Sequence, residues 1–207
     1  FLVYLIFCFC ARRKPEDLTQ IMTAYNCVVA LLSGVNFVLF VHSFVQAGTI
    51  FGITNDMTHE AFTLYNFSKR IELFDTVLMA LRHKRSQITI LHVYHHATML
   101  LLGDFAANYA MWSSVAVIFC VNTVVHVVTY SYYGLTSLGY SPPWKQLVTQ
   151  IQIAQFLVLQ VHVGIGWLFF GFCKWANIYG LIMIALFLNF YHRTYRTKPQ
   201  ATSVNDG

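Results

Sequence analysis

Long apolar segments follow one another along the whole chain, and they restrict the possible fold more than any other feature. Each segment is about 20 residues long, which is enough for an α-helix to cross a hydrocarbon core of ~30 Å. Charged residues make up only 10% of the 207 residues, against about 25% in a soluble domain. The sequence therefore predicts an all-α polytopic membrane protein, with a single integral-membrane domain over residues 1–207.

The apolar segments predict seven transmembrane helices, of which the first is truncated. Residues 1–10 are typical of the end of a helix, and the chain starts without Met, so we interpret the sequence as trimmed at both ends. The six full helices are expected at residues 21–45, 62–81, 88–105, 112–133, 144–170 and 175–195.

The net charge of +5 does not indicate nucleic acid, because the basic residues are concentrated in alternate loops. Between the expected helices on the other side, only Lys174 is basic. The loops and tail on the first side contain ten basic residues: Arg12, Arg13, Lys14, Arg82, Lys84, Arg85, Lys145, Arg193, Arg196 and Lys198. Cytoplasmic loops of membrane proteins carry an excess of Lys and Arg. The basic loops and the C-terminus are therefore expected to face the cytosol.

Four of the expected helices also carry polar side chains spaced three or four residues apart, which places them on one face of each helix. Ionisable groups inside a membrane cost about 2.5–3.5 kcal/mol each and usually face an interior cavity. With a rise of 1.5 Å per residue, these groups lie roughly 6–17 Å below the cytosolic surface. They are Lys69, Glu72, Asp75, Thr76, His92, His95, His96, Asn122, His126, Tyr130, Tyr133, Thr149, Gln152 and Gln155. We predict that they form a single polar chamber that opens toward the cytosol.

The stretch "HVYHH" at residues 92–96 contains three histidines on one helical turn and permits different chemistries. Two imidazoles at i and i+4 can share a metal ion, and the spacing also resembles one histidine box of the membrane di-iron desaturases and hydroxylases. No second histidine cluster is present, however. A neutral imidazole can instead act as base and nucleophile in acyl transfer. A seven-helix transporter or receptor is a further alternative, although inverted repeats and helices broken by Gly or Pro are not evident.

Four motifs together resemble those of the fatty acid elongases, in the order of that family. "KRIELFDT" (69–76) is similar to KxxExxDT, and "HVYHH" to HxxHH. "NTVVHVVTYSYY" (122–133) resembles NxxxHxxMYxYY, and "TQIQIAQ" (149–155) matches TxxQxxQ. Thr129 stands where the family usually has Met, a difference that we expect to affect local packing more than chemistry.

The resemblance implies a very-long-chain 3-oxoacyl-CoA synthase of the endoplasmic reticulum membrane. Such enzymes condense a long-chain acyl-CoA with malonyl-CoA to give 3-oxoacyl-CoA, CoA and carbon dioxide, with no bound cofactor or metal. Six of their seven helices wrap a tunnel for the acyl chain. Expected partners besides the bilayer are the 3-oxoacyl-CoA reductase, the dehydratase and the enoyl reductase of the elongation cycle. "QITILHVYHH", from Gln87, resembles the subgroup that elongates polyunsaturated chains.

Roles for the site residues follow as hypotheses. We expect His95 to accept the acyl group, and His92 and His96 to orient it or move protons. His126 and Asn122 would donate hydrogen bonds to the thioester oxygen and the enolate, as in an oxyanion hole. Glu72 and Asp75 would order the histidines, and Lys69 would pair with them or reach the substrate. The basic residues expected to attract CoA phosphates, or merely to set the orientation in the membrane, are Arg82, Lys84, Arg85 and Lys145.

Overall fold

The computed structural model describes residues 17–54 and 57–196, and within them it contains helices and no strand. The helices are α2 (Thr19–Ala47), α3 (His59–Glu72), α4 (Phe74–Leu81), α5 (Ile90–Tyr109), α6 (Ser113–Ser137), α7 (Lys145–Phe169) and α8 (Lys174–Tyr191). A 3-10 turn, Arg85–Gln87, precedes α5, and a π-helical turn, His192–Arg196, follows α8. The predicted helix at residues 1–10 lies outside the described residues, so the count of seven remains a prediction.

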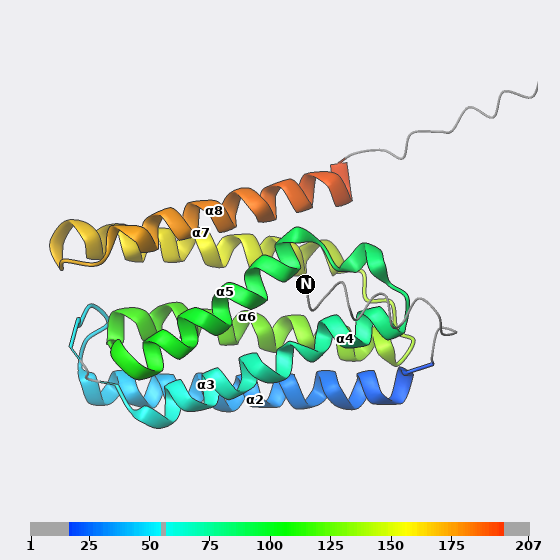
Figure 1. Ribbon diagram of the computed structural model, residues 1–207, viewed down its shortest axis with the longest axis horizontal. Helices are drawn as coiled ribbons and strands as arrows, with labels where there is room; N and C mark the ends of the chain where they lie inside the picture. The colour runs from blue at the N-terminus through cyan, green and yellow to red at the C-terminus, as the bar shows by residue number, and fades with distance from the viewer. Residues whose placement is uncertain (1–16, 55–56, 197–207) are drawn as a thin grey trace, which may run out of the picture.

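The predicted helices agree with the observed ones to within four residues at most ends, but the expectation of one continuous helix at 62–81 is wrong. This segment begins at His59 and is interrupted at Leu73, which separates α3 from α4. The Leu73 amide donates to the carbonyls of Arg70 and Ile71 while its dihedral angles stay helical, at φ −62° and ψ −23°. Such a tightened turn changes the rotation of the helix without ending it, and α4 continues in nearly the direction of α3 (Figure 1).

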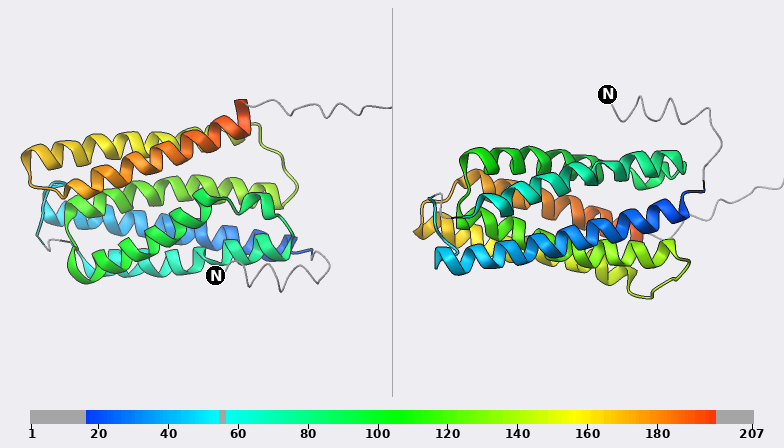
Figure 2. Two further views of the ribbon diagram at one scale, coloured as in Figure 1. Left: turned by 45° about the horizontal axis from the view of Figure 1, so that its top comes forward. Right: turned by 90° about the horizontal axis from the view of Figure 1, so that it is seen from below.

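The helices form a closed ring in an order that differs from their order in the chain (Figures 1 and 2). Around this ring, α2 packs against α6, α6 against α7, α7 against α8, α8 against α5, α5 against α3, and α3 against α2. The long axes of these helices run along one common direction. This order brings α3 and α6, which are far apart in the sequence, to adjoining parts of the interior.

Four helical segments are long and apolar enough to cross a membrane: Thr19–Ala47, Ser113–Ser137, Lys145–Phe169 and Lys174–Arg196. The protein is therefore a multi-pass membrane protein. The predicted spans at 62–81 and 88–105 are not among these four. The first is divided into α3 and α4, which have only 14 and 8 residues. The second corresponds to α5, which is long enough but contains three histidines and Asp104. A helix as long as α5, with 20 residues, nevertheless extends over about 30 Å.

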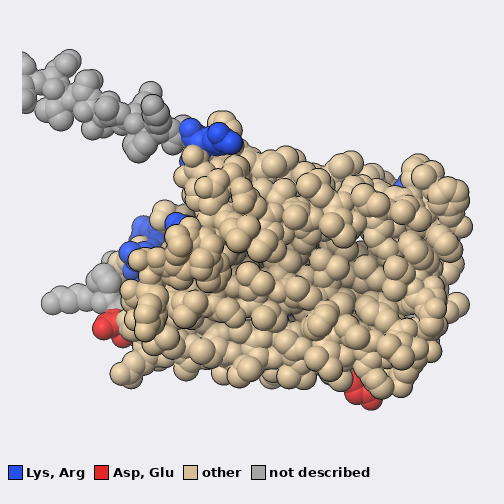
Figure 3. Space-filling view, turned by 180° about the vertical axis from the view of Figure 1, so that it is seen from behind, with Lys and Arg blue, Asp and Glu red and all other residues tan. Residues whose placement is uncertain are grey.

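The outer surface of the ring is apolar, with exposed Leu, Val, Ile and Phe side chains along α2, α7 and α8. Lys and Arg side chains gather mainly at one end of the molecule, which we call the basic end (Figure 3). There α4 finishes, α5 and α7 begin and α8 finishes. Lys174, at the start of α8, marks the opposite end. Arg12, Arg13, Lys14 and Lys198, which were also assigned to the cytosolic side, lie outside the described residues.

Aromatic side chains fill the interior between α2, α3 and α6. The rings of Tyr65 and Phe119 stack with centroids 4.2 Å apart, and Phe40 and Phe62 pack edge-on at 5.6 Å. This half of the interior is therefore filled, and the cavity described below lies between α5, α6, α7 and α8.

The end opposite the basic end is covered by the connection between α2 and α3. The Gly52 amide donates to Ser113 Oγ at 2.8 Å, which ties this connection to the start of α6. The ring of Phe51 then stacks on both His162 and Phe170, with centroids 4.9 and 4.6 Å away. An internal tunnel that starts at the basic end would therefore meet an aromatic barrier here.

Candidate active site

The three histidines of HVYHH occupy the first two turns of α5, close to the basic end. Thr89 caps this helix, because its hydroxyl accepts a hydrogen bond from the His92 amide. The ring centroids of His92 and His96 lie 4.5 Å apart, and those of His95 and His96 lie 5.6 Å apart. The cap thus fixes where the helix begins and, with it, the direction in which the imidazoles project.

The three imidazoles have different surroundings. His92 Nε2 lies 2.9 Å from Thr76 Oγ1, on α4. His96 turns toward Glu72, with its Nδ1 3.8 Å from Oε2. His95 is 9% exposed, and its Nδ1 has no hydrogen-bond partner among the described residues. Among the three, His95 thus has a fully buried ring nitrogen to which the described residues offer no hydrogen bond.

A single carboxylate, that of Glu72, joins three helices at the centre of the site. Lys69 Nζ donates to both of its oxygens, at 2.8 and 3.0 Å. His126 Nδ1, from α6, lies 3.1 Å from Oε1, and His96 approaches the other oxygen from α5. Lys69 and Glu72 are 3% and 1% exposed, so this is a buried ion pair with imidazoles on its other sides.

Asp75 contacts a tyrosine, which differs from the expectation that it orders a histidine directly. Its Oδ2 accepts a hydrogen bond from the Tyr130 hydroxyl. The Tyr130 ring packs at 5.5 Å from that of His126 and at 6.0 Å, edge-on, from that of Tyr133. Tyr130 follows His126 by four residues, so the two carboxylates contact successive turns of one face of α6.

Two of the polar residues of α7 form hydrogen bonds to residues other than the histidines, and the single polar chamber stays a prediction. Thr149 Oγ1 lies 3.3 Å from the Tyr195 hydroxyl, and Gln152 Nε2 lies 3.5 Å from Thr129 Oγ1. Neither contact involves a histidine. Gln155 instead lines the internal cavity, and its Oε1 has no partner in the described part of the chain.

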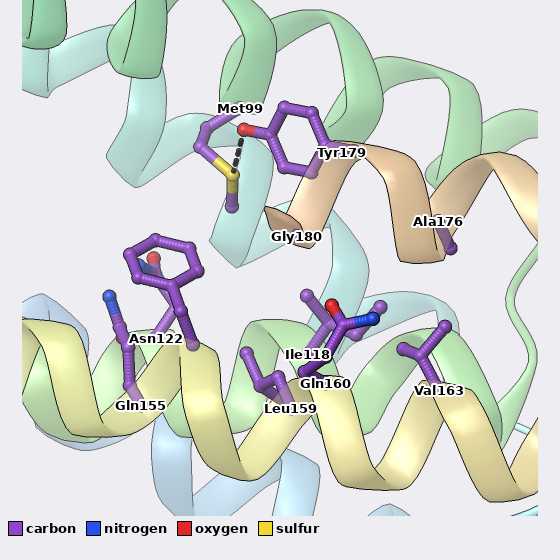
Figure 4. Close-up of a pocket in the computed structure, with 11 residues that line it drawn as sticks. Met99, Ile118, Asn122, Gln155, Leu159, Gln160, Val163, Ala176, Tyr179 and Gly180 are labelled. Atoms are coloured by element: carbon purple, nitrogen blue, oxygen red, sulfur yellow. Dashed lines mark hydrogen bonds between the residues drawn. The ribbon is translucent and has the colours of Figure 1, made fainter. Parts of the chain in front are cut away.

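A narrow cavity of ≈ 40 Å³ lies between α5, α6, α7 and α8, and one of its lining residues, Phe156, contacts His95 (Figure 4). His95 packs edge-on against Phe156, whose centroid is 6.4 Å away. The lining residues of α7 extend from Gln155 to Val163, which corresponds to about 12 Å of helix. The lining consists of Met99, Ile118, Asn122, Gln155, Phe156, Leu159, Gln160, Val163, Ala176, Tyr179 and Gly180.

Asn122 connects the cavity with the buried polar cluster. Its Oδ1 accepts a hydrogen bond from the Tyr65 hydroxyl at 3.1 Å. The carbonyl oxygen is thus used by Tyr65, and the amide NH₂ group is the part of the side chain that can still donate a hydrogen bond. Asn122 is thus placed to donate a hydrogen bond where the cavity meets the histidines.

The four basic residues selected from the sequence all lie at the basic end. Arg82 follows α4 and donates to Met22 Sδ. Lys84 and Arg85 belong to the turn before α5, and Lys145 is the first residue of α7. The residues described here include no group of three or more His, Cys, Asp or Glu side chains placed to hold a metal ion.

Comparison with known proteins agrees with this arrangement. The model of the ELO (GNS1/SUR4) family matches residues 1–203. The chain belongs to this family. Very long chain fatty acid elongase 7 of Rattus norvegicus is 37% identical over 215 aligned residues, covering 91% of this chain and 74% of the relative.

Other members of the ELO family are similarly close. Very long chain fatty acid elongase 5 of Mus musculus is 36% identical and covers 90% of this chain and 68% of the relative. The elongase 5 of Tachysurus fulvidraco is 33% identical, with 92% and 70% covered. Membership of this family decides among the alternatives that the HVYHH motif left open.

Sequence reasoning missed one residue of this ELO-family site, Tyr65. The Tyr65 hydroxyl donates a hydrogen bond to Asn122, and the centroid of the Tyr65 ring lies 5.0 Å from Lys69 Nζ. Tyr65 precedes Lys69 by four residues, so it continues the polar face of α3. Extending that face by one turn would have included it.

Proposed function

We propose that this ELO-family protein is a very-long-chain 3-oxoacyl-CoA synthase. In the proposed reaction it condenses a long-chain acyl-CoA with malonyl-CoA and releases 3-oxoacyl-CoA, CoA and carbon dioxide. The observation that carries the proposal is the position of His95, a buried imidazole beside an apolar cavity and close to the basic end. This arrangement suits a substrate with an apolar chain, a reactive thioester and an anionic head.

The first half of the reaction transfers the acyl group to His95. A ring nitrogen of neutral His95 attacks the thioester carbonyl carbon, the C–S bond breaks and CoA leaves as a thiolate. The resulting acyl-imidazolium gives its proton to His126 Nε2, which passes it to the thiolate. Glu72 lies next to His126 Nδ1 and favours the tautomer with hydrogen on that nitrogen. His126 therefore serves as a proton acceptor rather than as the hydrogen-bond donor expected from sequence.

The second half forms the new carbon–carbon bond. Malonyl-CoA loses carbon dioxide, and the electron pair of the broken bond forms an enolate, whose carbon attacks the acyl carbonyl. The C–N bond to His95 then breaks, and the imidazole recovers a proton through His96 or His92 from solvent. The NH₂ group of Asn122 donates to the oxygen on which negative charge develops. Removing one such donor typically lowers the rate by about 10²–10³.

The remaining parts of the proposal concern topology, partners and specificity. Six helices around an acyl tunnel, preceded by a first helix in residues 1–10, give seven spans, and the ring of α2 to α8 supports this reading. The basic end faces the cytosol, as does the C-terminus, in the endoplasmic reticulum membrane. The protein needs no bound cofactor or metal, and it passes its product to the reductase, dehydratase and enoyl reductase. The sequence from Gln87 to His96 favours polyunsaturated chains.

Label incorporation tests the proposed activity. Membranes that contain the intact protein receive radiolabelled malonyl-CoA together with a panel of saturated and polyunsaturated acyl-CoAs. We expect label in 3-oxoacyl products that depends on the acyl chain offered, with the highest rates for polyunsaturated chains. A well-folded protein that incorporates no label from any chain would contradict the proposal, and equal rates on saturated chains would contradict the preference.

Neutralising the basic end tests whether it binds CoA phosphates. In the triple variant Lys84→Gln, Arg85→Gln and Lys145→Gln, we expect the KM for malonyl-CoA to rise about tenfold, because charge-assisted bonds to phosphate are lost. The increase should become smaller at high ionic strength. Lys174→Gln, the same change at the opposite end, should leave the KM unaltered. If the triple variant also keeps its KM, the positive charges serve membrane orientation alone.

A further inference from the structure

One residue that lines the cavity, Gln160, belongs to a second polar position, which the condensation reaction does not use. It is formed by Gln160, from α7, and Asn177, from α8, whose side chains meet with Nε2 donating to Oδ1 at 2.9 Å. Gln160 lies four residues beyond Phe156, so it is about 6 Å deeper along α7 than the aromatic ring next to His95. The apolar residues Leu159, Val163 and Ala176 line the cavity around it.

One hydrogen bond between two amides leaves half of their capacity unused. Gln160 Oε1 and Asn177 Nδ2 are both buried, and neither has a partner among the described residues. The first atom can only accept a hydrogen bond and the second can only donate one. Buried polar atoms without partners are destabilising and uncommon. A ligand group that both donates and accepts a hydrogen bond would satisfy the acceptor and the donor at once.

Glycine residues provide the space for this amide pair. At Gly180 a Cβ atom would collide with Gln160 Oε1, so any other residue would displace the oxygen. At Gly164 a Cβ would lie 3.9 Å from Asn177 Oδ1. Figure 4 shows the Gln160 side chain projecting from α7 toward α8, where Gly180 lies. Gln160 Oε1 therefore packs against Gly180, which also lines the cavity, with no side chain of that residue between them.

We propose that Gln160 and Asn177 form a binding position for a hydroxyl group on the acyl chain. The hydroxyl hydrogen is donated to Gln160 Oε1, and the hydroxyl oxygen accepts from Asn177 Nδ2. A methylene group would satisfy neither atom, and a keto group would satisfy only the donor. The proposal rests on the proposed function, because it makes the protein an elongase that accepts hydroxylated acyl-CoAs.

The other unpartnered amide oxygen in the cavity belongs to a different position. Gln155 Oε1 lies in the same cavity, together with Asn122 and Phe156, at the end next to His95. A thioester or enolate reaches that end during the reaction. The Gln160 position lies farther from His95, in the part of the cavity that would hold the acyl chain. Its polar atoms therefore affect which acyl chains bind.

A series of hydroxyacyl-CoAs of one length tests the proposal. Each carries a single hydroxyl at a different carbon, and each is compared with the unsubstituted acyl-CoA in membranes containing the intact protein. We expect kcat/KM to be about tenfold higher than for the unsubstituted chain at one position, or at two adjacent positions, in the half nearer the thioester. Hydroxyls near the methyl end should give no gain.

Two variants with side chains of similar size locate the effect. Gln160→Met and Asn177→Leu should each reduce the ratio of hydroxylated to unsubstituted kcat/KM to about one. Gln150→Leu, which alters the same helix at an exposed site bonded to Tyr191, should keep the intact ratio.

Each outcome of the series decides the matter. If the intact protein elongates the unsubstituted chain and favours no hydroxylated one, the amide pair holds a water molecule or only ties α7 to α8, and this inference is wrong while the proposed function stands. If a preference exists but survives both substitutions, the hydroxyl binds elsewhere and the assignment to Gln160 and Asn177 is wrong. If a folded protein elongates no chain at all, the proposed function fails and this inference fails with it.

Discussion

Replacement of His95 by alanine is expected to lower elongation by about 10⁴-fold or more, because removing a nucleophile leaves only the binding and hydrogen-bond contributions. The variant should still fold, since His95 Nδ1 makes no hydrogen bond to the described residues and the ring is held by packing against Phe156 and Phe187 and against the neighbouring imidazoles. The measurement is a single turnover of labelled acyl-CoA with malonyl-CoA, together with thermal stability in detergent.

Matched histidine variants separate nucleophile from helper. His92→Ala and His96→Ala should each cost about 10²-fold, as expected for groups that orient or move protons. His42→Ala should keep full activity, because His42 bonds to Gln46 on α2, outside the site.

Rapid quenching and peptide mapping locate the acyl group itself. The intact protein incubated with acyl-CoA alone should carry the label on His95, and the His95→Ala variant should carry none. An adduct on His96, or full turnover by His95→Ala, would show that the nucleophile has been assigned to the wrong imidazole.

The second large effect is expected at Glu72. Glu72→Gln removes the charge that Lys69 faces in a buried pair, with the two side chains 1% and 3% exposed. Leaving one partner of a buried ion pair uncompensated typically costs about 3–5 kcal/mol. We therefore expect a marked fall in the free energy of unfolding, measured by denaturation in detergent. Glu60→Gln, the same substitution at an exposed position in the first turn of α3, serves as the control.

Activity and stability should separate when both charges are removed. The double variant Lys69→Met with Glu72→Leu no longer contains an unpaired buried charge, so most of the lost stability should return. Turnover should stay low, because His126 Nδ1 would lose the carboxylate that fixes its tautomer. If the double variant recovers turnover as well, Glu72 has a structural role only and does not position His126.

The helices and the motif residues follow largely from local sequence. Apolar segments of sufficient length predicted α2, α6, α7 and α8, because the length of a span is a property of one segment. Spacings of three and four residues placed the histidines of α5 on neighbouring turns, because the period of an α-helix is fixed by its backbone. The resemblance of four motifs to those of the ELO family then predicted the reaction, the condensation of acyl-CoA with malonyl-CoA.

The partners of these residues were decided by tertiary structure. Glu72 and Asp75 share a face in sequence, but Glu72 meets His126 and Asp75 meets Tyr130. His126 and Tyr130 lie on successive turns of one face of α6, and the position of α6 in the ring brings that face opposite the two carboxylates.

The same holds for α7 and for the cavity. Thr149 and Gln152 match the family motif, yet they contact Tyr195 and Thr129 instead of the histidines. The sequence by itself determined which faces of the helices are polar, because periodicity acts within one segment. Only the packed ring decided which polar faces meet and where space remains, because those contacts depend on side-chain volumes from helices distant in the chain.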